Sequence, residues 1–251
     1  MEGFRFYRSE LIEFVISRDR RAGFAEHCHS GHYVVTYIFS GNAVVKRGGV
    51  ASGVNAGECF TVKPYEGHSL ISEGNVGLAA MCIDKGVLSR ERGEFEGVIS
   101  RSINGFSRAA GGDVPGKALE LFYEKALELY EAYGGITADM SGDPFILQSI
   151  RSIEESPESE YDIGHLSRGA CLGRYYFIRK FHEAAGLTPH KFRIQSRVRM
   201  AQRLLAAGSA IAVTAQSAGF YDQSHFTGQF RKIVGISPGE YIRSLRNFLQ
   251  D

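Results

Sequence analysis

The chain has 251 residues, which is enough for two modest domains or one large one. Its hydrophobic content of 43% and charged content of 23% are those of an ordinary soluble globular protein and exclude a disordered or fibrous chain. No run approaches the ~18 consecutive apolar residues of a membrane span, and the charged N-terminal segment lacks the apolar stretch of an export signal. The four cysteines form no CxxC pair. We therefore expect reduced thiols, a cytoplasmic location and no membrane partner.

The net charge of +1 is divided unevenly along the chain. Residues 1–143 carry 15 Lys and Arg against 19 Asp and Glu, whereas residues 144–251 carry 14 against 9. A basic C-terminal half joined to an acidic N-terminal half is typical of a protein in which only one domain meets phosphate groups. The charge therefore favours nucleic-acid binding by the C-terminal half, with a merely solvated helical surface as the alternative.

From about residue 23 to residue 100, short β-rich runs alternate with Gly-containing turns. The clearest runs are YVVTYIFSG (33–41), NAVVKRGG (42–49), GECFTVKP (57–64) and GLAAMCI (77–83). Within 33–39 both alternating sets of side chains are largely apolar, so this strand is expected to be buried on both faces. The N-terminal part is therefore predicted to be an all-β sandwich or small barrel.

A helical pattern follows Pro115. Segment 116–133 places five apolar residues on one stripe, and Gly134-Gly135 ends it. The stripe consists of Leu119, Phe122, Ala126, Leu129 and Tyr133. The stretch around 134–143 is rich in Gly, Asp and Ser and is the expected linker, because everything beyond Pro144 has the pattern of further helices.

Two segments beyond the linker have the same build of a short helix, a tight turn and a second helix. In the first, predicted helices 163–170 and 174–185 flank a turn; in the second, 211–217 and 223–234 do so. Each second helix ends at a Gly followed closely by a Pro, which suits a left-handed cap and prevents the helix from continuing.

One long helix over 189–207 is predicted between these two segments. Its expected buried side consists of Phe192, Val198, Ala201, Leu204 and Leu205. A helix, a tight turn and a second helix that enters the major groove form a helix-turn-helix unit. Two units held by one helix can fill two successive groove segments on one face of DNA.

The candidate DNA contacts are the polar side chains left on the outer face of the two second helices. They are Arg174, Tyr175, Arg179, Gln223, Ser224, His225, Thr227 and Gln229. Arg reads guanine with two hydrogen bonds, Gln reads adenine, and Ser or Thr contact phosphates and thymine methyl groups. A merely solvated helix more often exposes Glu and Lys, which these positions lack, so the pattern favours DNA binding.

Residues 144–251 resemble the DNA-binding domain of the AraC/XylS family of bacterial transcription regulators. The resemblance is carried by RYYFIRKFHEAAGLTPHKF, RVRMAQRLLAAG and AGFYDQSHFTGQFRKIVGISPGEY, and it continues more weakly into the first hundred residues, where GECFTVKPYEGH matches best. It implies a cupin-like effector-sensing domain over residues 1–140 and a double helix-turn-helix domain over 141–251. The implied partners are double-stranded DNA, a small-molecule or metal effector and, for an activator, RNA polymerase.

Four positions depart from the family pattern. Gly173 replaces the usual Ser before the first recognition helix, and Gly228 replaces an arginine that faces DNA. Ile178 stands where a polar residue is common, and Thr214 where the core usually has Ile or Val. Gly within a helix costs about 1 kcal/mol relative to Ala. These departures bear on the sequence specificity of each unit and leave the fold unchanged.

The N-terminal half holds a cluster of histidines. His27, His29 and His32 form HCHSGH, and His68 closes PYEGH. On a strand His27 and His29 point to the same face. In cupins an HxH pair and a later His meet at a metal, and neutral imidazoles suit Zn, Ni, Cu or Fe. The acidic ligand usual after such a pair is missing, so the alternative is a set of hydrogen-bonding groups at the barrel mouth.

The resemblance also implies two roles for apolar residues. An organic effector in the barrel lumen would be lined by Tyr33, Tyr37 and Phe39, with plain core packing as the alternative. Helices after the barrel pair two subunits in the family, so helix 116–133 is a candidate homodimer contact through Leu119, Phe122, Ala126 and Leu129. The alternative is that this stripe packs on its own barrel.

Three hypotheses follow. The first is a transcription regulator, not an enzyme, that is controlled by a small effector. The second, a subclass of the first, is a metal-responsive regulator. The third is a cupin metalloenzyme with His27, His29 and His68 as ligands, which the missing carboxylate and the paired helix-turn-helix units disfavour.

Overall fold

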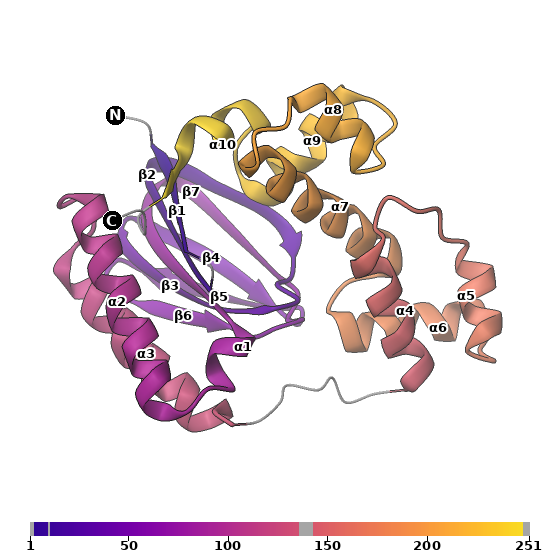
Figure 1. Cartoon of the computed structure of the whole chain (residues 1–251), viewed down its shortest axis with the longest axis horizontal. Coiled ribbons are helices and arrows are strands. Elements are labelled where there is room, and N and C mark those ends of the chain that lie inside the picture. The colour runs from indigo at the N-terminus through magenta and orange to yellow at the C-terminus, as the bar shows by residue number, and fades with distance from the viewer. Residues whose placement is uncertain (1–2, 10, 136–142, 248–251) are drawn as a thin grey trace.

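The computed structural model describes residues 3–9, 11–135 and 143–247. Within these ranges the N-terminal part consists of strands followed by helices (Figure 1). The strands are β1 (Phe4–Arg8), β2 (Ile12–His27), β3 (His32–Ser40), β4 (Asn42–Arg47), β5 (Val50–Asn55), β6 (Cys59–Val62) and β7 (His68–Asp84). The helices are α1 (Lys85–Leu88), α2 (Arg92–Ala110) and α3 (Gly116–Tyr133). The predicted linker lies mostly outside the described residues.

The C-terminal part is helical and lies on the other side of the strands from α2 and α3 (Figure 1). It contains α4 (Pro144–Glu155), α5 (Ile163–Gly169), α6 (Arg174–Ala185), α7 (Pro189–Ala206), α8 (Ile211–Ser217), α9 (Gln223–Val234), α10 (Pro238–Ser244) and the short strand β8 (Leu245–Asn247). The predicted order of a β-rich part followed by an α-helical part is confirmed. Within the described residues the structure adds β1, the part of β2 before residue 23, α1, α2 and β8. The β-rich runs end at Asp84 and not near residue 100, because α1 and α2 follow there.

Strand β7 lies at the centre of the sheet. It is antiparallel to β2 along one side, and along the other it pairs first with β4 and then with β3. Strand β3 also pairs with β6, β4 with β5, and β2 with β1. This register places His27, the last residue of β2, opposite His68, the first residue of β7.

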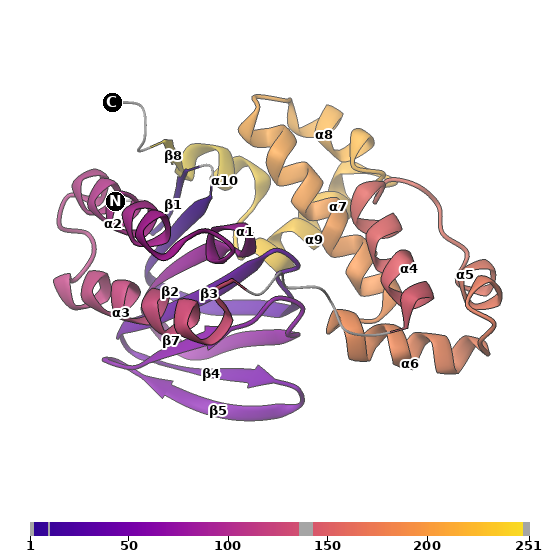
Figure 2. The same ribbon diagram turned by 60° about the horizontal axis from the view of Figure 1, so that its bottom comes forward.

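The two faces of the sheet bury separate cores. On one face, side chains of β2 to β7 such as Val34 and Leu78 pack on one another. On the other, Phe14, Tyr33 and Tyr37 pack against α2 and α3, which cover that side of the sheet (Figure 2). Strand β3 contributes apolar side chains to both cores, which explains why both of its faces are apolar in the sequence.

Helix α3 carries the predicted stripe and packs it against its own chain. Phe122, Ala126 and Leu129 are buried in the core under α2 and the sheet, and Leu119 and Tyr133 pack at its margin. The alternative that the stripe packs on its own chain is therefore confirmed for Phe122, Ala126 and Leu129, and a subunit contact through these three residues is wrong. Leu119 is half-buried. A homodimer formed through another surface of the helix stays a prediction.

The four helices of the two helix-turn-helix units begin and end within one residue of their predicted bounds. Asp162 and Asp222 cap α5 and α9 by accepting hydrogen bonds from backbone N–H groups of the first turn. Gly186 and Gly235 end α6 and α9 in the left-handed conformation, with φ of 71° and 87°. Thr214 is fully buried in the second unit, and its hydroxyl finds no hydrogen-bond partner among the described residues.

The helical part does not form its cores alone. Phe4 and Phe6 of β1 pack in one core with α7, α8, α9 and α10, including Phe226 and Tyr241. Cys28, directly after β2, is buried in the core of α4, α6 and α7. Strand β8 returns to the sheet and pairs in parallel with β1. The two parts predicted as separate domains therefore share buried side chains across their boundary.

Two general expectations concern the membrane and the cysteines. Of the helices within the described ranges, none is long and apolar enough to cross a membrane. All four cysteines are free, and burial raises the pKa of the Cys28 and Cys82 thiols, which keeps both in the protonated form.

Candidate functional site

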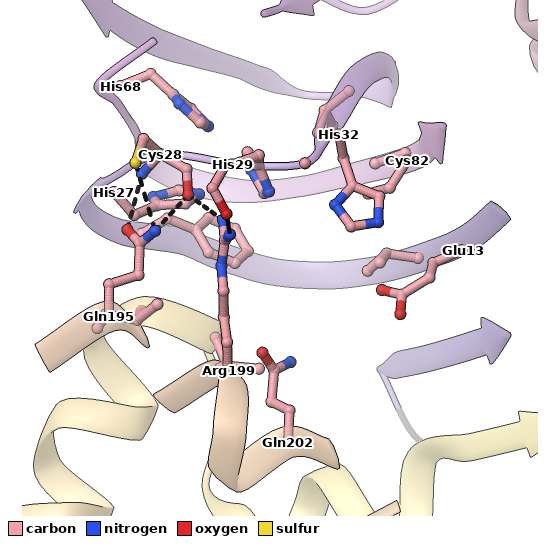
Figure 3. A pocket seen from close by; sticks show the side chains of 18 of the residues that line it. Glu13, His27, Cys28, His29, His32, His68, Cys82, Gln195, Arg199 and Gln202 are labelled. Atoms are coloured by element: carbon pink, nitrogen blue, oxygen red, sulfur yellow. Dashed lines mark hydrogen bonds between the residues drawn. The ribbon is translucent and has the colours of Figure 1, made fainter. Parts of the chain in front are cut away.

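A cavity of about 520 Å³ lies between the sheet and the helical part. Its apolar lining comes mainly from the strands and includes Val15, Phe24, Phe60 and Leu78. Helix α9 contributes its last turn, with Ile233 and Val234. Polar groups reach it from both sides, and Figure 3 shows that the histidines come from the strand side while Gln195, Arg199 and Gln202 come from α7. An apolar wall with a few convergent polar groups is typical of a small-molecule site.

Three of the four predicted histidines meet at this cavity. The ligand-capable atoms of His27, His29 and His68 all lie within 4.8 Å of one another. The ring centroids of His27 and His68 are 4.2 Å apart, and that of His29 is 5.2 Å from each. His32 also lines the cavity but lies away from this group, with its Nε2 3.9 Å from a carboxylate oxygen of Asp84. We call His27, His29 and His68 the histidine triad.

Backbone carbonyls fix the tautomers of two triad members. His27 Nδ1 lies 2.8 Å from the carbonyl oxygen of Ala25, and His68 Nδ1 lies 3.0 Å from that of Glu66. A carbonyl only accepts hydrogen bonds, so each Nδ1 carries the proton and donates it. The Nε2 lone pair of both rings is therefore left free.

Burial keeps the triad neutral. Loss of hydration, together with the nearby His68 and Arg199, lowers the pKa of His27 to about 3. Burial also lowers the pKa of His29 well below its ordinary value, and that of His68 below it. Neutral imidazole is the form that accepts a hydrogen bond or binds a metal.

Helix α7 holds the chain segment on which two triad members lie. Cys28 N–H donates to Gln195 Oε1 at 2.8 Å, and Gln195 Nε2 donates to the Cys28 carbonyl oxygen at 2.6 Å. Arg199 donates to the same carbonyl and to Ser30 Oγ. The segment 28–30 is thus fixed to the helical part through four hydrogen bonds, three to Cys28 and one to Ser30 (Figure 3).

A second contact joins the first helix-turn-helix unit to the loop before His68. A Cβ added at Gly186, the cap of α6, would lie 2.1 Å from the carbonyl oxygen of Tyr65, and one added at Gly67 would lie 2.2 Å from the carbonyl oxygen of Gly186. Tyr65 itself has a left-handed backbone, with φ of 61°. Only glycine permits the two backbones to approach this closely.

The predicted effector-lining residues do not line the cavity. Tyr33 and Tyr37 are buried in the core under α2 and α3, with the Tyr33 ring 5.2 Å from that of Tyr133, and Phe39 packs at the margin of the same core. Their neighbours on the opposite face of β3, Val34 and Thr36, line the cavity instead. The prediction was wrong because both faces of β3 are apolar, so its sequence does not distinguish the face toward the cavity from the face toward the helices.

The candidate DNA contacts of the first unit lie on the exposed face of α6. Arg174, Tyr175 and Arg179 are all exposed, Tyr175 to 90%. The Arg179 guanidinium lies 4.9 Å from the ring centroid of Tyr176, and its Nε is 3.8 Å from a carboxylate oxygen of Glu183. Both contacts are at the surface, where ion pairs contribute little and exchange readily for a phosphate or a base.

The candidate contacts of the second unit lie along α9. Gln223, Ser224 and His225 are exposed, and Thr227 and Gln229 are half-buried. Gly228 is exposed, and a Cβ at this position would touch nothing, so the surface has a gap where a long side chain would fit.

Sequence reasoning missed several residues at these surfaces. Tyr176 and Tyr221 are exposed aromatics beside the predicted contacts, Tyr221 to 96%. Their exposure became known only from the structure, since an aromatic residue in a helical segment is more often part of the core. Gln195 and Arg199 were missed because a polar residue on a helix is expected to face water, whereas α7 buries part of its polar side against the strands.

Together, a ligand-sized cavity and two exposed helix-turn-helix units define a DNA-binding regulator with its own sensor domain. Residues 11–84 match the model of the AraC-like ligand binding domain, and residues 166–244 match that of a helix-turn-helix domain. The protein belongs to the AraC/XylS family of transcription regulators. Members of this family are not enzymes, so the hypothesis of a cupin metalloenzyme is set aside.

Similar proteins include two curated regulators and one solved structure. The probable transcriptional regulator LumQ of Photobacterium leiognathi is 32% identical over 90 residues, 36% of either chain. The arabinose operon regulatory protein of Escherichia coli (strain K12) is 29% identical over 85 residues, 34% of this chain and 29% of that protein. The chain spans about a third of the length of these relatives. ToxT of Vibrio cholerae superposes with a TM-score of 0.58 over 94% of this chain and 99% of ToxT, at 16% identity, which shows a common fold.

Proposed function

We propose that a small ligand bound in the cavity controls the DNA binding of this regulator. The observation that carries the proposal is that one cavity is bounded both by the sensor strands and by α7 and α9 of the DNA-binding part. A ligand there contacts both parts at once, so its affinity depends on how they are arranged. By linkage, the ligand then shifts the population of that arrangement.

The lining favours an amphipathic ligand. The phenylalanine and aliphatic side chains suit an apolar body, and the histidines, Gln195 and Arg199 suit a polar head group. A structure of ToxT, which shares the fold, is described as bound to an unsaturated fatty acid. This supports a ligand with an apolar chain and an anionic head as the first class to test.

Oleate is the probe for the ligand proposal. We expect oleate to raise the melting temperature of the full chain and to change its affinity for an operator selected from random DNA. Ala80→Phe should fill the cavity, abolish both ligand effects and leave DNA binding in place, because Ala80 lines the cavity and lies away from the exposed faces of α6 and α9. Equal responses of wild type and variant would contradict a ligand site in this cavity.

We also propose that the eight predicted side chains on α6 and α9 contact DNA. Arg174→Ala and Arg179→Ala should each weaken operator binding by ~1–3 kcal/mol, because a guanidinium that reads guanine loses two hydrogen bonds. Single changes at Gln223, Ser224 or His225 should cost less, since the gap at Gly228 removes a contact from α9.

The matched control is Arg108→Ala, which removes the same charge from the exposed side of α2. Its operator affinity, measured by fluorescence anisotropy at one salt concentration, should stay within about twofold of wild type. Losses in α9 larger than those in α6 would reverse the proposed ranking of the two units.

A further inference from the structure

We propose that His27, His29 and His68 bind one divalent transition-metal ion at the polar end of the cavity. All three rings offer a nitrogen within 4.8 Å of the others: His27 ends β2, His29 lies two residues beyond that end, and His68 begins β7. The tetrahedral geometry of zinc needs ligand nitrogens about 3.3 Å apart, so the rings must approach one another by about 1.5 Å at most. Rotation of the His29 side chain and a small movement of the 27–29 segment would bring the rings together and keep the Nδ1 hydrogen bonds of His27 and His68.

The hydrogen bonds around the triad are those of a metal site. A ligating histidine usually donates its other ring N–H to a carbonyl or carboxylate, which fixes the ring and the tautomer. His27 and His68 already do so through Ala25 and Glu66, and this directs each Nε2 lone pair away from the backbone. Two of the three rings thus present an unprotonated nitrogen, as ligands of one metal ion must.

The ligand set selects the class of metal. Three neutral nitrogens without a carboxylate suit Zn²⁺, Co²⁺, Ni²⁺ or Cu²⁺, whereas Mg²⁺ and Ca²⁺ require oxygen ligands. Three protein ligands leave a coordination position for a water or an effector oxygen. The positive charge of Arg199 lies near the triad and opposes the binding of a cation without a counter-charge. An anionic group in the open coordination position of the metal would offset this repulsion.

The site also offers a route from the metal to the DNA-binding part. Cys28 lies between two of the ligands, and its backbone is held by Gln195 and Arg199 of α7. Gly67, directly before His68, packs against Gly186 of the first helix-turn-helix unit. Drawing the three rings together therefore acts on these two contacts between the sensor strands and the helices. This regulatory consequence rests on the proposed function, whereas the metal site does not.

Binding is tested on the untagged full chain after removal of metals with a chelator. Co²⁺ should bind one ion per chain and give visible absorption bands of a low-coordinate site, Zn²⁺ should displace it, and Mg²⁺ should produce no signal. His29→Asn and His68→Asn should each weaken Co²⁺ binding at least tenfold. His32→Asn is the matched control, since His32 lines the same cavity outside the triad, and it should bind Co²⁺ within about twofold of wild type.

Melting temperatures without metal show whether each variant is folded. Absence of Co²⁺ binding by folded wild type at micromolar concentrations would overturn the site. Undiminished binding in folded His29→Asn and His68→Asn would overturn it equally.

Regulation is tested separately by operator affinity with and without Zn²⁺. Couplings between two sites are typically about 5- to 150-fold, so we expect a change of at least fivefold in wild type and a smaller one in Gln195→Ala, which removes two of the hydrogen bonds to Cys28. Metal bound at the triad without any change in operator affinity would overturn the regulatory role and leave the metal site standing. A chain that binds metal but no DNA would contradict the proposed function instead.

Discussion

Gly186→Ala is expected to lower the free energy of unfolding by about 2–5 kcal/mol and to loosen the first helix-turn-helix unit from the sensor strands. Two costs combine here. The residue caps α6 at a φ of 71°, where a Cβ is unfavourable by about 1 kcal/mol. The added Cβ would also lie 2.1 Å from the carbonyl oxygen of Tyr65 and 2.6 Å from the amide nitrogen of Gly67, and backbone atoms cannot move aside as a side chain can. Urea unfolding measures the loss.

Two other glycines separate these costs. Gly208 has a φ of 89° with nothing within 4 Å of an added Cβ, so Gly208→Ala should cost only the backbone term, about 1 kcal/mol. Gly67 lies outside the left-handed region but its added Cβ would meet the carbonyl oxygen of Gly186, so Gly67→Ala reports the close approach alone. If Gly186→Ala and Gly208→Ala lowered the free energy of unfolding equally, the 65–67 loop would accommodate the added Cβ without loss of stability.

The sequence predicted the helix-turn-helix units closely because their ends are set by local chemistry. Gly186 and Gly235 end α6 and α9 with positive φ, and Pro189 and Pro238 prevent either helix from continuing. These constraints act within a few residues, so they are visible without any knowledge of tertiary contacts. Three of the four predicted cavity histidines were also found together, since the HxH spacing and the following strand pairing bring them to one sheet edge.

The features that the sequence did not indicate depend on which helix packs on which face of a strand or of another helix. Tyr33 and Val34 are both apolar, and only the positions of α2 and α3 decide which of them lies away from the cavity. Gln195 resembles a solvated residue until Cys28 is placed beside it. The stripe of α3 has the same pattern whether it faces its own sheet or a second subunit. In each case one local sequence pattern is compatible with two environments, and residues distant in the sequence determine which of them the side chain occupies.

Strand β1 and the second helix-turn-helix unit share a core, so a substitution in β1 is expected to destabilise that unit. Phe6→Ala is expected to lower the free energy of unfolding by about 3–5 kcal/mol, as is usual for a buried phenylalanine. Phe6 is 7% exposed, and its ring lies 4.9 Å from that of Tyr241 in an edge-on arrangement and 5.1 Å from that of Phe4. Tyr241 in turn packs on Phe230 of α9. The cavity left by Phe6 therefore opens beside Tyr241, which supports Phe230 of the second recognition helix.

Operator affinity should fall with stability in this variant, although Phe6 lies in the N-terminal strand and on no DNA-facing surface. Phe145→Ala is the control, because it removes the same ring from the start of α4, where 52% of the residue is exposed, and should cost under about 1 kcal/mol with operator affinity unchanged. Urea unfolding and fluorescence anisotropy, performed on both variants, give the two quantities. If Phe6→Ala were no more damaging than Phe145→Ala, or if residues 144–251 alone unfolded at the same urea concentration as the full chain, the second unit would not depend on β1, and residues 141–251 would be an independent domain.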